Sequence, residues 1–269
     1  PALLWGRLLG PRWVGAGRGD VWHATFLAPP RPPKGTPWVA TIHDLIPLRH
    51  PTGFTLAQRA VFARSLRWSS RADRVVAVSP FTADLVAATF GVPRSRIEVV
   101  PPPIDVALFA APPTRGLRGA DGPYLLHAGG FDPLKGVVDL LLPAFVQLAA
   151  VRKDLVLALT GGDGAARARA ERAAAALGVA GRVRFTGHLD ETAHAAAIAG
   201  AAAVVVSSHE EGFGMPVGEA LAAGVPVAVG PAPAARDAAG PHGCLALGET
   251  PAALARAIDD ALLRGDALS

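Results

Sequence analysis

Cysteine is almost absent from this chain of 269 residues, in which Cys244 is the single example. One thiol excludes an internal disulfide and a cysteine-based metal cluster, and it fits a reducing compartment. The His, Asp and Glu residues also show no convincing metal-ligand spacing. The sequence therefore offers no predicted metal site.

Long apolar runs are scarce as well. Hydrophobic residues make up 51% of the chain and charged residues 18%, which is enough for a sizeable core. The apolar stretches are broken by Arg, Asp, Gly or Pro, and none approaches the roughly 20 residues that span a bilayer. No secretory signal is visible where the sequence opens. We therefore expect neither a membrane span nor a leader.

Two nucleotide-binding fingerprints are missing. No G-x-G-x-x-G stands at a strand-to-helix turn, which argues against a dehydrogenase, and there is no Walker-type G-K-[ST]. The net charge is only +4, without a Lys/Arg block typical of a nucleic-acid arm. We expect no nucleic-acid partner. The basic excess is either a solvated surface or an attraction to anionic membranes or phosphorylated substrates.

Short β-branched runs alternate with Ala/Leu/Arg segments of helical period, a pattern that predicts βαβ units and parallel sheets. Strands are predicted at 21–26, 38–43, 74–78, 97–100, 124–128, 155–160, 182–185, 203–207, 226–229 and 244–247. Helices are predicted at 55–69, 81–89, 137–150, 165–177, 191–199, 216–223 and 251–263. Ser79 is the expected N-cap of the second of these helices, because a proline follows it.

A stretch rich in proline and glycine interrupts this alternation. Residues 101–123 lack periodicity, as expected of an interdomain linker. The sequence thus predicts an N-terminal α/β domain over 1–110, a linker over 111–123 and a second, complete α/β domain over 124–269. The first domain looks incomplete, because no opening strand precedes its first helix-like stretch.

The strongest local signal is a loop with a carboxylate at each end. Glu211 and Glu219 are separated by seven residues, directly after the predicted buried strand 203–207. The carboxyl ends of parallel strands are where ligands bind, and Gly212 and Gly214 permit close backbone approach. Pro216 begins a helix whose free N–H groups suit a phosphate. The alternative is structural: Glu219 favours the helix dipole and Glu211 caps a turn.

These residues belong to an ordered series of stretches that resembles the family 4 glycosyltransferases, and the likeness runs from about Asp20 to Asp260. In chain order the stretches are DVWHATF, WVATIHDLIPLRHP, RVVAVSPFTADLVAATFGVPRSRIEVVPPPID, YLLHAGGFDPLKGVVDLLLPAF, RVRFTGHLDE and EGFGMPVGEALAAGVPVAVG. The resemblance implies a GT-B fold, in which two Rossmann-like domains face a cleft.

The resemblance also implies a role for each matching position. Glu219 would bind the ribose hydroxyls of a nucleotide, and Glu211 would contact the donor sugar near its reacting carbon. Lys135 would neutralise the diphosphate, and His43 would line the cleft near the sugar and the acceptor hydroxyl. For Lys135 and His43 the alternative is a solvated lysine at a helix start and a structural histidine. The remaining implied donor-binding positions are Gly129, Gly130, His188, Leu189, Phe213, Gly214, Met215 and Pro216.

The other histidines carry weaker expectations. His23, His127 and His188 are left open between lining the cleft and serving the structure alone. We expect purely structural roles for His50, His194, His209 and His242.

The activity implied by the resemblance is that of a retaining hexosyltransferase. It would move a sugar from a nucleoside diphosphate sugar, a consumed donor and not a cofactor, to a glycan or lipid-linked acceptor without a metal. The TIHDLIPLRHP stretch is most similar to members that transfer mannose in surface polysaccharide assembly. A cytoplasmic location is expected, with peripheral association at the membrane face.

The sequence departs from the family pattern in three ways. The family pairs its lysine with an arginine, but Gly130 and Leu134 stand at the two expected positions. The opening Gly-rich loop and the C-terminal helix that returns to the first domain are also not evident. These departures support an alternative, a non-catalytic GT-B domain that only binds nucleotide or glycan. An epimerase or phosphorylase is a further alternative, although the acid/base or anion-binding residues it needs are not identified.

Overall fold

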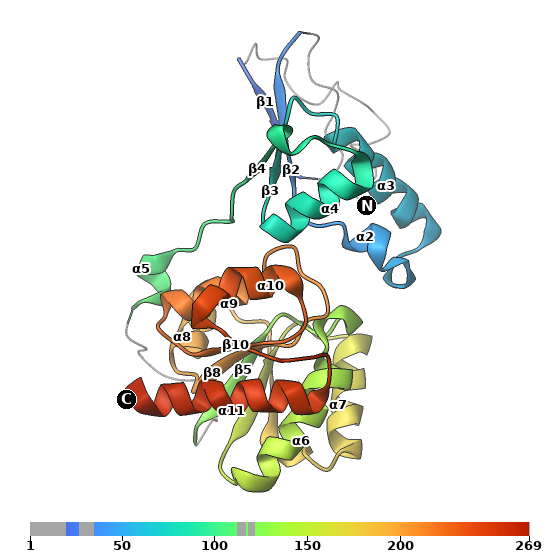
Figure 1. The fold of residues 1–269 in the computed structure, drawn as a ribbon. Helices are drawn as coiled ribbons and strands as arrows, with labels where there is room; N and C mark the ends of the chain where they lie inside the picture. Colours follow the sequence, from blue (N-terminus) through green and yellow to red (C-terminus); the bar gives the residue numbers. More distant parts are fainter. Residues whose placement is uncertain (1–19, 27–34, 112–116, 118–121, 269) are drawn as a thin grey trace. The chain divides into compact units, whose positions relative to one another are not determined.

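The computed structural model describes residues 20–26, 35–111, 117 and 122–268, and every structural statement below refers to them. They form two compact units that divide between Pro102 and Pro103. Each unit is built around a parallel sheet with helices between its strands (Figure 1). The predicted opening of the first domain and most of the predicted linker lie outside the described residues.

The first unit has a four-stranded parallel sheet in the order β1-β2-β3-β4. Its buried side chains alternate along β2, where Trp38, Ala40 and Ile42 point into the core. Its strands are β1 (Trp22–Ala24), β2 (Trp38–Ile42), β3 (Arg74–Ala77) and β4 (Ile97–Val99), and its α-helices are α2 (Ile46–Arg49), α3 (Leu56–Ser69) and α4 (Pro80–Phe90).

Helix ends in this unit follow their local sequence. Thr55 and Gln58 form a reciprocal capping box at the start of α3. The Ser79 hydroxyl accepts a hydrogen bond from the Thr82 N–H, which confirms the predicted N-cap of α4. Gly91 ends that helix in a left-handed conformation with φ 66°.

The second unit has a six-stranded parallel sheet in the order β10-β9-β8-β5-β6-β7. The strands are β5 (Tyr124–Ala128), β6 (Val156–Thr160), β7 (Val183–Gly187), β8 (Ala203–Val206), β9 (Val227–Val229) and β10 (Cys244–Leu245). The chain adds β6 and β7 on one side of β5, then returns to add β8, β9 and β10 on the other. The order therefore reverses between β5 and β8, the point at which ligand crevices form in open α/β sheets.

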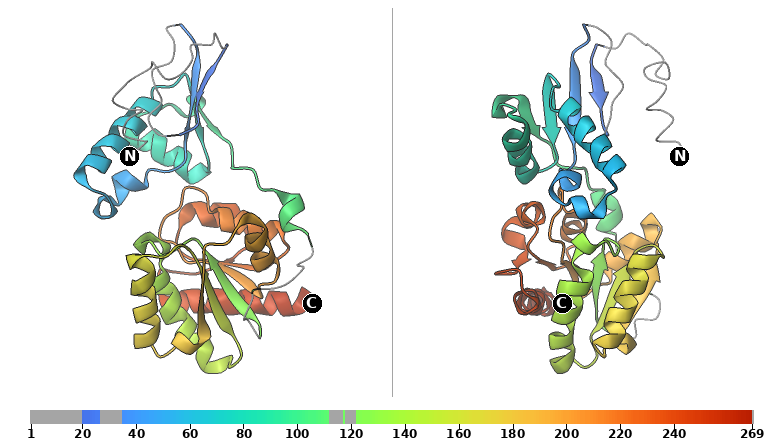
Figure 2. Two further views of the ribbon diagram at one scale, coloured as in Figure 1. Left: turned by 180° about the vertical axis from the view of Figure 1, so that it is seen from behind. Right: turned by 90° about the vertical axis from the view of Figure 1, so that its right-hand side faces the viewer.

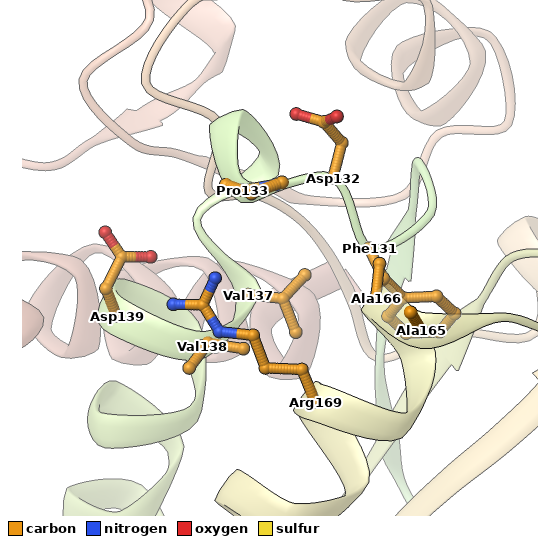
Figure 3. A pocket seen from close by; sticks show the side chains of 9 residues that line it. All are labelled: Phe131, Asp132, Pro133, Val137, Val138, Asp139, Ala165, Ala166 and Arg169. Atoms are coloured by element: carbon orange, nitrogen blue, oxygen red, sulfur yellow. The ribbon is translucent and has the colours of Figure 1, made fainter. Parts of the chain in front are cut away.

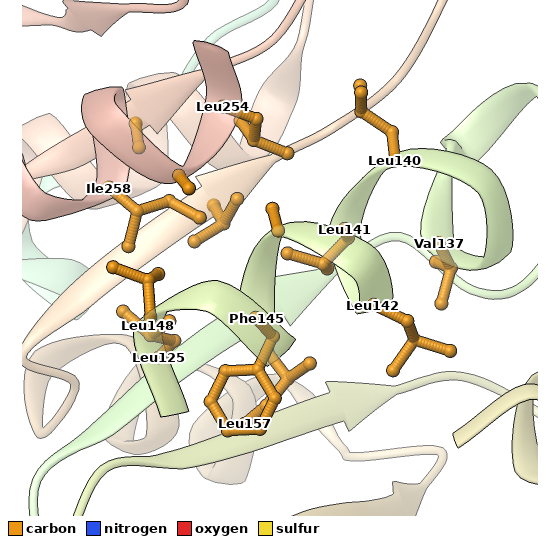
Figure 4. Close-up of a cluster of buried hydrophobic side chains, with 14 of the residues drawn as sticks. Leu125, Val137, Leu140, Leu141, Leu142, Phe145, Leu148, Leu157, Leu254 and Ile258 are labelled. Atoms are coloured by element: carbon orange, nitrogen blue, oxygen red, sulfur yellow. The ribbon is translucent and has the colours of Figure 1, made fainter. Parts of the chain in front are cut away.

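Helices cover both faces of this second sheet, and the strands supply alternate side chains to the two layers (Figure 2). Leu125 packs under α6 and α11, whereas its neighbour Leu126 packs under α8 and α9. The close-up in Figure 4 shows Phe145, Leu148 and Ile258 meeting on the first of these faces. The helices are α5 (Val106–Phe109), α6 (Leu142–Val151), α7 (Ala165–Ala176), α8 (Glu191–Ala199), α9 (Met215–Ala222), α10 (Pro233–Ala239) and α11 (Pro251–Leu268).

The division between the units falls earlier than the boundary predicted at residue 110. Residues 103–109 belong to the second unit, because α5 packs there against α8 and α9. Phe109 is buried in the core of that unit, with Ile104 and Leu108 beside it. Residues 101–123 are rich in proline and lack helical periodicity, so the sequence did not predict that α5 packs against the second unit.

Among the described residues, three short α-helices were not predicted from the sequence: α2, α5 and α10. The predicted helix 137–150 also begins differently, since Val137–Leu141 is a π-helical turn that precedes α6. The N–H of Leu141 donates to the carbonyl of Gly136, five residues earlier, at 2.8 Å, which is the hydrogen bond of a π-helical turn. Periodicity alone does not distinguish such a turn from α-helix.

One described segment does reach the length and apolarity needed to cross a bilayer, contrary to the expectation from the sequence. Residues Pro133–Val151 have a mean hydropathy of 1.7 over their most apolar window. Leu141 and Phe145 in this segment are fully buried against the sheet of the second unit. Their burial accounts for the apolar composition, as in the core helix of an α/β domain.

Candidate functional site

Lys135 and Glu211 meet at the reversal point of the second sheet. Lys135 follows β5 and Glu211 follows β8, and these neighbouring strands end at the same edge. The Lys135 Nζ donates to Glu211 Oε1 at 2.7 Å, with the two side chains 27% and 14% exposed. The pair predicted from the sequence as catalytic is therefore brought together by the strand order.

The backbone around Lys135 is fixed by a glycine that the sequence reading did not single out. Gly136 has φ 64°, and a Cβ placed on it would overlap the carbonyl oxygen of Ser207. Glycine is thus the residue that the site requires here. The Ser207 hydroxyl donates to the carbonyl of Lys135 at 2.7 Å, which joins the two loops a second time.

Ser208 completes the surroundings of the carboxylate. Its hydroxyl donates to Glu211 Oε1 at 2.6 Å, so the oxygen that faces Lys135 accepts two hydrogen bonds. Nearby, Nε2 of His209 lies 2.7 Å from Asp139 Oδ2 in the π-helical turn, a contact that agrees with the structural role predicted for His209. The charged and hydroxyl groups hold Lys135 and Glu211 in one arrangement.

His127 is buried next to this cluster. The ring is 2% exposed and lies 3.1 Å from the Val205 carbonyl and 3.3 Å from the Gly130 carbonyl. Burial lowers the pKa of His127 to about 4, and the Lys135 charge acts in the same direction against the two carbonyl contacts. The neutral ring has one N–H, so it donates to one carbonyl at a time.

The loop before α9 takes the tight path that its glycines predict. Gly214 has φ 97°, and a Cβ on it would stand 3.0 Å from Ala235. Met215 opens the helix and is 37% exposed, and Pro216 occupies its first turn. Pro216 has no N–H and the Val217 N–H donates to the Gly214 carbonyl at 2.9 Å, so the first turn of α9 offers the Met215 N–H at the loop that carries Glu211.

Glu219 has a partner that the sequence did not reveal. Its Oε2 lies 2.9 Å from Nε2 of His194 on α8, and the two side chains are 12% and 24% exposed. His194 was expected to be structural, and its contact with a neighbouring helix is compatible with that expectation. The sequence shows a histidine on a predicted helix, but only the packing of α8 against α9 shows that it reaches Glu219.

The remaining predicted positions lie at different places. Gly129 and Gly130 form the turn after β5, and a Cβ on Gly129 would be 3.7 Å from the Lys135 side chain. His188 is exposed after β7, and Leu189 packs against the core formed with α8 and α9. His43 is exposed in the other unit, where its Nε2 lies 2.9 Å from the Thr25 carbonyl.

A pocket of about 340 Å³ lies beside the site without including it (Figure 3). None of the predicted site residues lines it. The lining residues are Phe131, Asp132, Pro133, Val137, Val138, Asp139, Ala165, Ala166 and Arg169. Across the ranges that the structure covers, no group of three or more His, Cys, Asp or Glu side chains is arranged to hold a metal ion.

Two family descriptions match the chain, one for each half. Residues 115–268 match the glycosyl transferases group 1, and residues 2–108 match glycosyltransferase family 4. D-inositol 3-phosphate glycosyltransferase of Streptomyces avermitilis is 32% identical over 88% of this chain and 55% of its own length. The enzyme of the same name from Thermomonospora curvata is 34% identical over 67% of this chain and 47% of its own length. The chain thus spans about half the length of these curated relatives.

Solved structures share the arrangement of the elements. Sucrose-phosphate synthase from Thermosynechococcus elongatus aligns with a TM-score of 0.68 at 26% identity, over 85% of this chain and 59% of its own. Anabaena HepE in complex with UDP-glucose aligns with a TM-score of 0.67 at 19% identity, over 86% and 64% respectively. With both halves matched in order and the parallel sheets shared, the chain belongs to the group 1 glycosyltransferases of family 4 and has their GT-B fold.

Proposed function

We propose that this chain carries the donor site of a retaining glycosyltransferase. The enzyme would transfer a sugar from a nucleoside diphosphate sugar to a glycan or lipid-linked acceptor. The observation that carries the proposal is the Lys135–Glu211 pair at the reversal point of the second sheet, with the start of α9 beside it. The solved relatives with UDP-glucose or UDP bound support a nucleotide-sugar donor of the same class.

The proposed chemistry is electrostatic. Lys135 and the N-terminal end of α9, with the Met215 N–H, would stabilise the negative charge that develops on the departing diphosphate. Glu211 would lie against the donor sugar, and a phosphate oxygen of the leaving group would accept the proton of the acceptor hydroxyl. No metal is required in this scheme, because the lysine and the helix start supply the positive charge. His43, in the other unit, is assigned to the sugar and the acceptor hydroxyl.

Glu219 is assigned to the nucleotide. It lies in the second turn of α9, beyond Gly214 and Met215, and its carboxylate is held by His194. An ionised carboxylate accepts hydrogen bonds only, which suits the hydroxyl groups of a ribose. In this proposal the nucleoside of the donor binds at Glu219, and its diphosphate binds at Lys135.

The missing arginine has a predicted consequence. Gly130 and Leu134 supply no positive charge where the family has a second diphosphate contact. We expect weaker donor binding than in a family member with both charges, by about tenfold for one charged hydrogen bond. The same departure favours the alternative of a binding domain without transfer activity.

We also propose a particular donor sugar and a cellular setting. Mannose is the proposed sugar, from the TIHDLIPLRHP stretch in the first unit, and a cytoplasmic enzyme associated with the membrane face is the proposed setting. The relatives named for D-inositol 3-phosphate also make a polyol phosphate acceptor worth including in the test.

A transfer assay tests this proposal. The chain is incubated with GDP-mannose, UDP-glucose or UDP-N-acetylglucosamine and with glycan, lipid-linked and inositol phosphate acceptors. We expect release of one nucleoside diphosphate and a product that keeps the anomeric configuration of the donor in its NMR spectrum. Glu211→Gln should lose the release and the exposed control Glu249→Gln should keep it. Release that is unchanged in Glu211→Gln contradicts the proposed site, and nucleotide binding without transfer favours the binding-domain alternative.

A further inference from the structure

His194 contacts a proposed donor-binding group of the second unit and has no proposed role of its own. It projects from α8, and its Nε2 is 2.9 Å from Glu219 Oε2 on the neighbouring helix α9. Neither the spacing of the sequence motifs nor the family resemblance assigns it a function. The contact joins two helices that are far apart in the chain.

The chemistry of the pair fixes which atom donates. An ionised carboxylate has no proton to give, so the Nε2 of His194 carries the hydrogen and Glu219 Oε2 accepts it. Oε1 of Glu219 has no further protein partner within the described residues. One oxygen of Glu219 is therefore held by the protein, and the other remains available to a ligand hydroxyl.

The histidine ring is itself held by the segment that joins the two units. Phe109 meets the ring edge-to-face, with centroids 6.0 Å apart and planes at 89°. Phe109 is buried on α5, and the Asp105 side chain caps that helix by accepting from the Leu108 N–H at 3.0 Å. Contacts thus run from Phe109 to His194 and on to Glu219.

The same segment also contacts α9 directly. A Cβ placed on Gly218 would stand 3.1 Å from the Ile104 side chain, which would have to shift by a few tenths of an ångström to admit it. Gly218 directly precedes Glu219, and the backbone at the carboxylate is therefore packed against the segment that carries Phe109. Both the side chain and the backbone of Glu219 are restrained by residues 104–109 and their contacts.

We propose that His194 is a positioning residue that orients the Glu219 carboxylate toward the ribose hydroxyls of the nucleotide donor, with Phe109 holding the imidazole ring. A partly exposed polar contact of this kind contributes little to stability, which leaves orientation as its main effect. Fixing the carboxylate before the ligand arrives lowers the entropy that binding must overcome. This inference rests on the proposed function.

Calorimetry on the full chain tests it with pairs of nucleotides. UDP, GDP and ADP are titrated first, and the tightest binder is then compared with its 2′,3′-dideoxy counterpart. We expect His194→Leu to weaken the ribonucleotide by about tenfold, the effect of one hydrogen bond to a charged group. The same variant should leave the affinity for the dideoxynucleotide unchanged, because that ligand offers Glu219 no hydroxyl.

A conservative variant separates positioning from general support of the structure. His194→Gln keeps an N–H donor toward Glu219 and should bind the ribonucleotide within about threefold of the unaltered chain. Equal weakening of both nucleotides in His194→Leu, or no weakening of either, overturns the role of His194 while leaving the donor site intact. If the unaltered chain binds none of the three nucleotides, the proposed function fails and this inference fails with it.

Discussion

At the scale of single residues, Lys135 is the side chain on which the proposed chemistry depends most. Its ammonium group lies 2.7 Å from one carboxylate oxygen and is therefore confined to one place. A diphosphate carries more negative charge than that carboxylate, so it would attract the same ammonium strongly. The chain has two other lysines, Lys34 and Lys153, and the second is exposed and distant in sequence.

Lys135→Met should therefore abolish most of the transfer activity. We expect kcat/KM to fall by about 10²–10³, the usual cost of removing one charge-stabilising group from an active site. The matched control is Lys153→Met, which removes a lysine outside the site and should leave kcat/KM unchanged. Steady-state rates of nucleoside diphosphate release measure both variants. Comparable rates for the two would show that Lys135 is only a solvated lysine at a helix start.

His127 makes a prediction about stability and pH. Its pKa is about 4 in the folded protein against 6.5 for an ordinary histidine, because burial disfavours the charged ring. The unfolded chain thus binds more protons between these values, and the free energy of unfolding falls as pH drops from 6.5 toward 4. The loss attributable to His127 reaches roughly 3 kcal/mol at pH 4.

His127→Asn tests this, because asparagine keeps an N–H near the Val205 carbonyl and does not titrate. Urea unfolding at pH 7 and at pH 4.5 gives the free energy of unfolding of each protein. The variant should start less stable at pH 7 and lose less stability on acidification than the unaltered chain. Parallel losses in the two proteins would contradict a neutral buried His127.

At the scale of elements, the turn that carries Lys135 depends on Gly136. Gly136 and Gly91 have nearly the same backbone angle, φ 64° and 66°, but only Gly136 faces a backbone atom where a Cβ would stand. Gly91→Ala should cost about 1 kcal/mol of stability for the left-handed backbone alone. Gly136→Ala adds the overlap with Ser207 and should cost several kcal/mol more than the control.

Thermal unfolding of both glycine variants measures this difference. Because Gly136 directly follows Lys135, the Gly136→Ala protein should also bind nucleotide more weakly than the Gly91→Ala protein. Equal unfolding temperatures for the two variants would mean that the loop after β8 yields easily and does not fix the lysine.

How far the sequence predicts these elements depends on the kind of signal each one has. Strands such as Tyr124–Ala128 and helices such as Glu191–Ala199 have the predicted bounds, because apolar runs and flanking caps mark them. Four-residue α5 lies among prolines and has only Asp105 as a cap, so no period reveals it. The π-turn at Val137–Leu141 has no signal of its own.

The residues of the candidate site likewise fall into those that the sequence predicts and those that only the structure reveals. Lys135, Glu211 and Glu219 stand in motifs and could be found from the sequence, and the strand order explains why the first two meet. His194 and Ser208 could not be found, since their roles arise from packing between α8 and α9 and from one loop geometry. His43 was named from the resemblance, and its role stays a prediction.

At the scale of the whole molecule, the division after Pro102 predicts where the second unit can be separated. A polypeptide of residues 103–269 keeps α5, whereas one of residues 111–269 loses Phe109 and uncovers the core beneath it. Removing a buried aromatic side chain costs about 3–5 kcal/mol. Urea unfolding should show the shorter polypeptide less stable by at least about 3 kcal/mol. Equal free energies of unfolding for the two polypeptides would instead support a boundary between the units at residue 110.

In the proposed function, the second unit holds a nucleotide-sugar donor with Glu219 at the nucleoside end. The most direct measurement is calorimetry of the full chain against a panel of nucleoside diphosphates and their sugars, with Glu219→Ala and the exposed control Glu249→Ala beside it. We expect saturable binding of one nucleotide by the unaltered chain and the control, and no detectable binding by Glu219→Ala. Binding that survives in Glu219→Ala at full affinity would contradict the placement of the donor site.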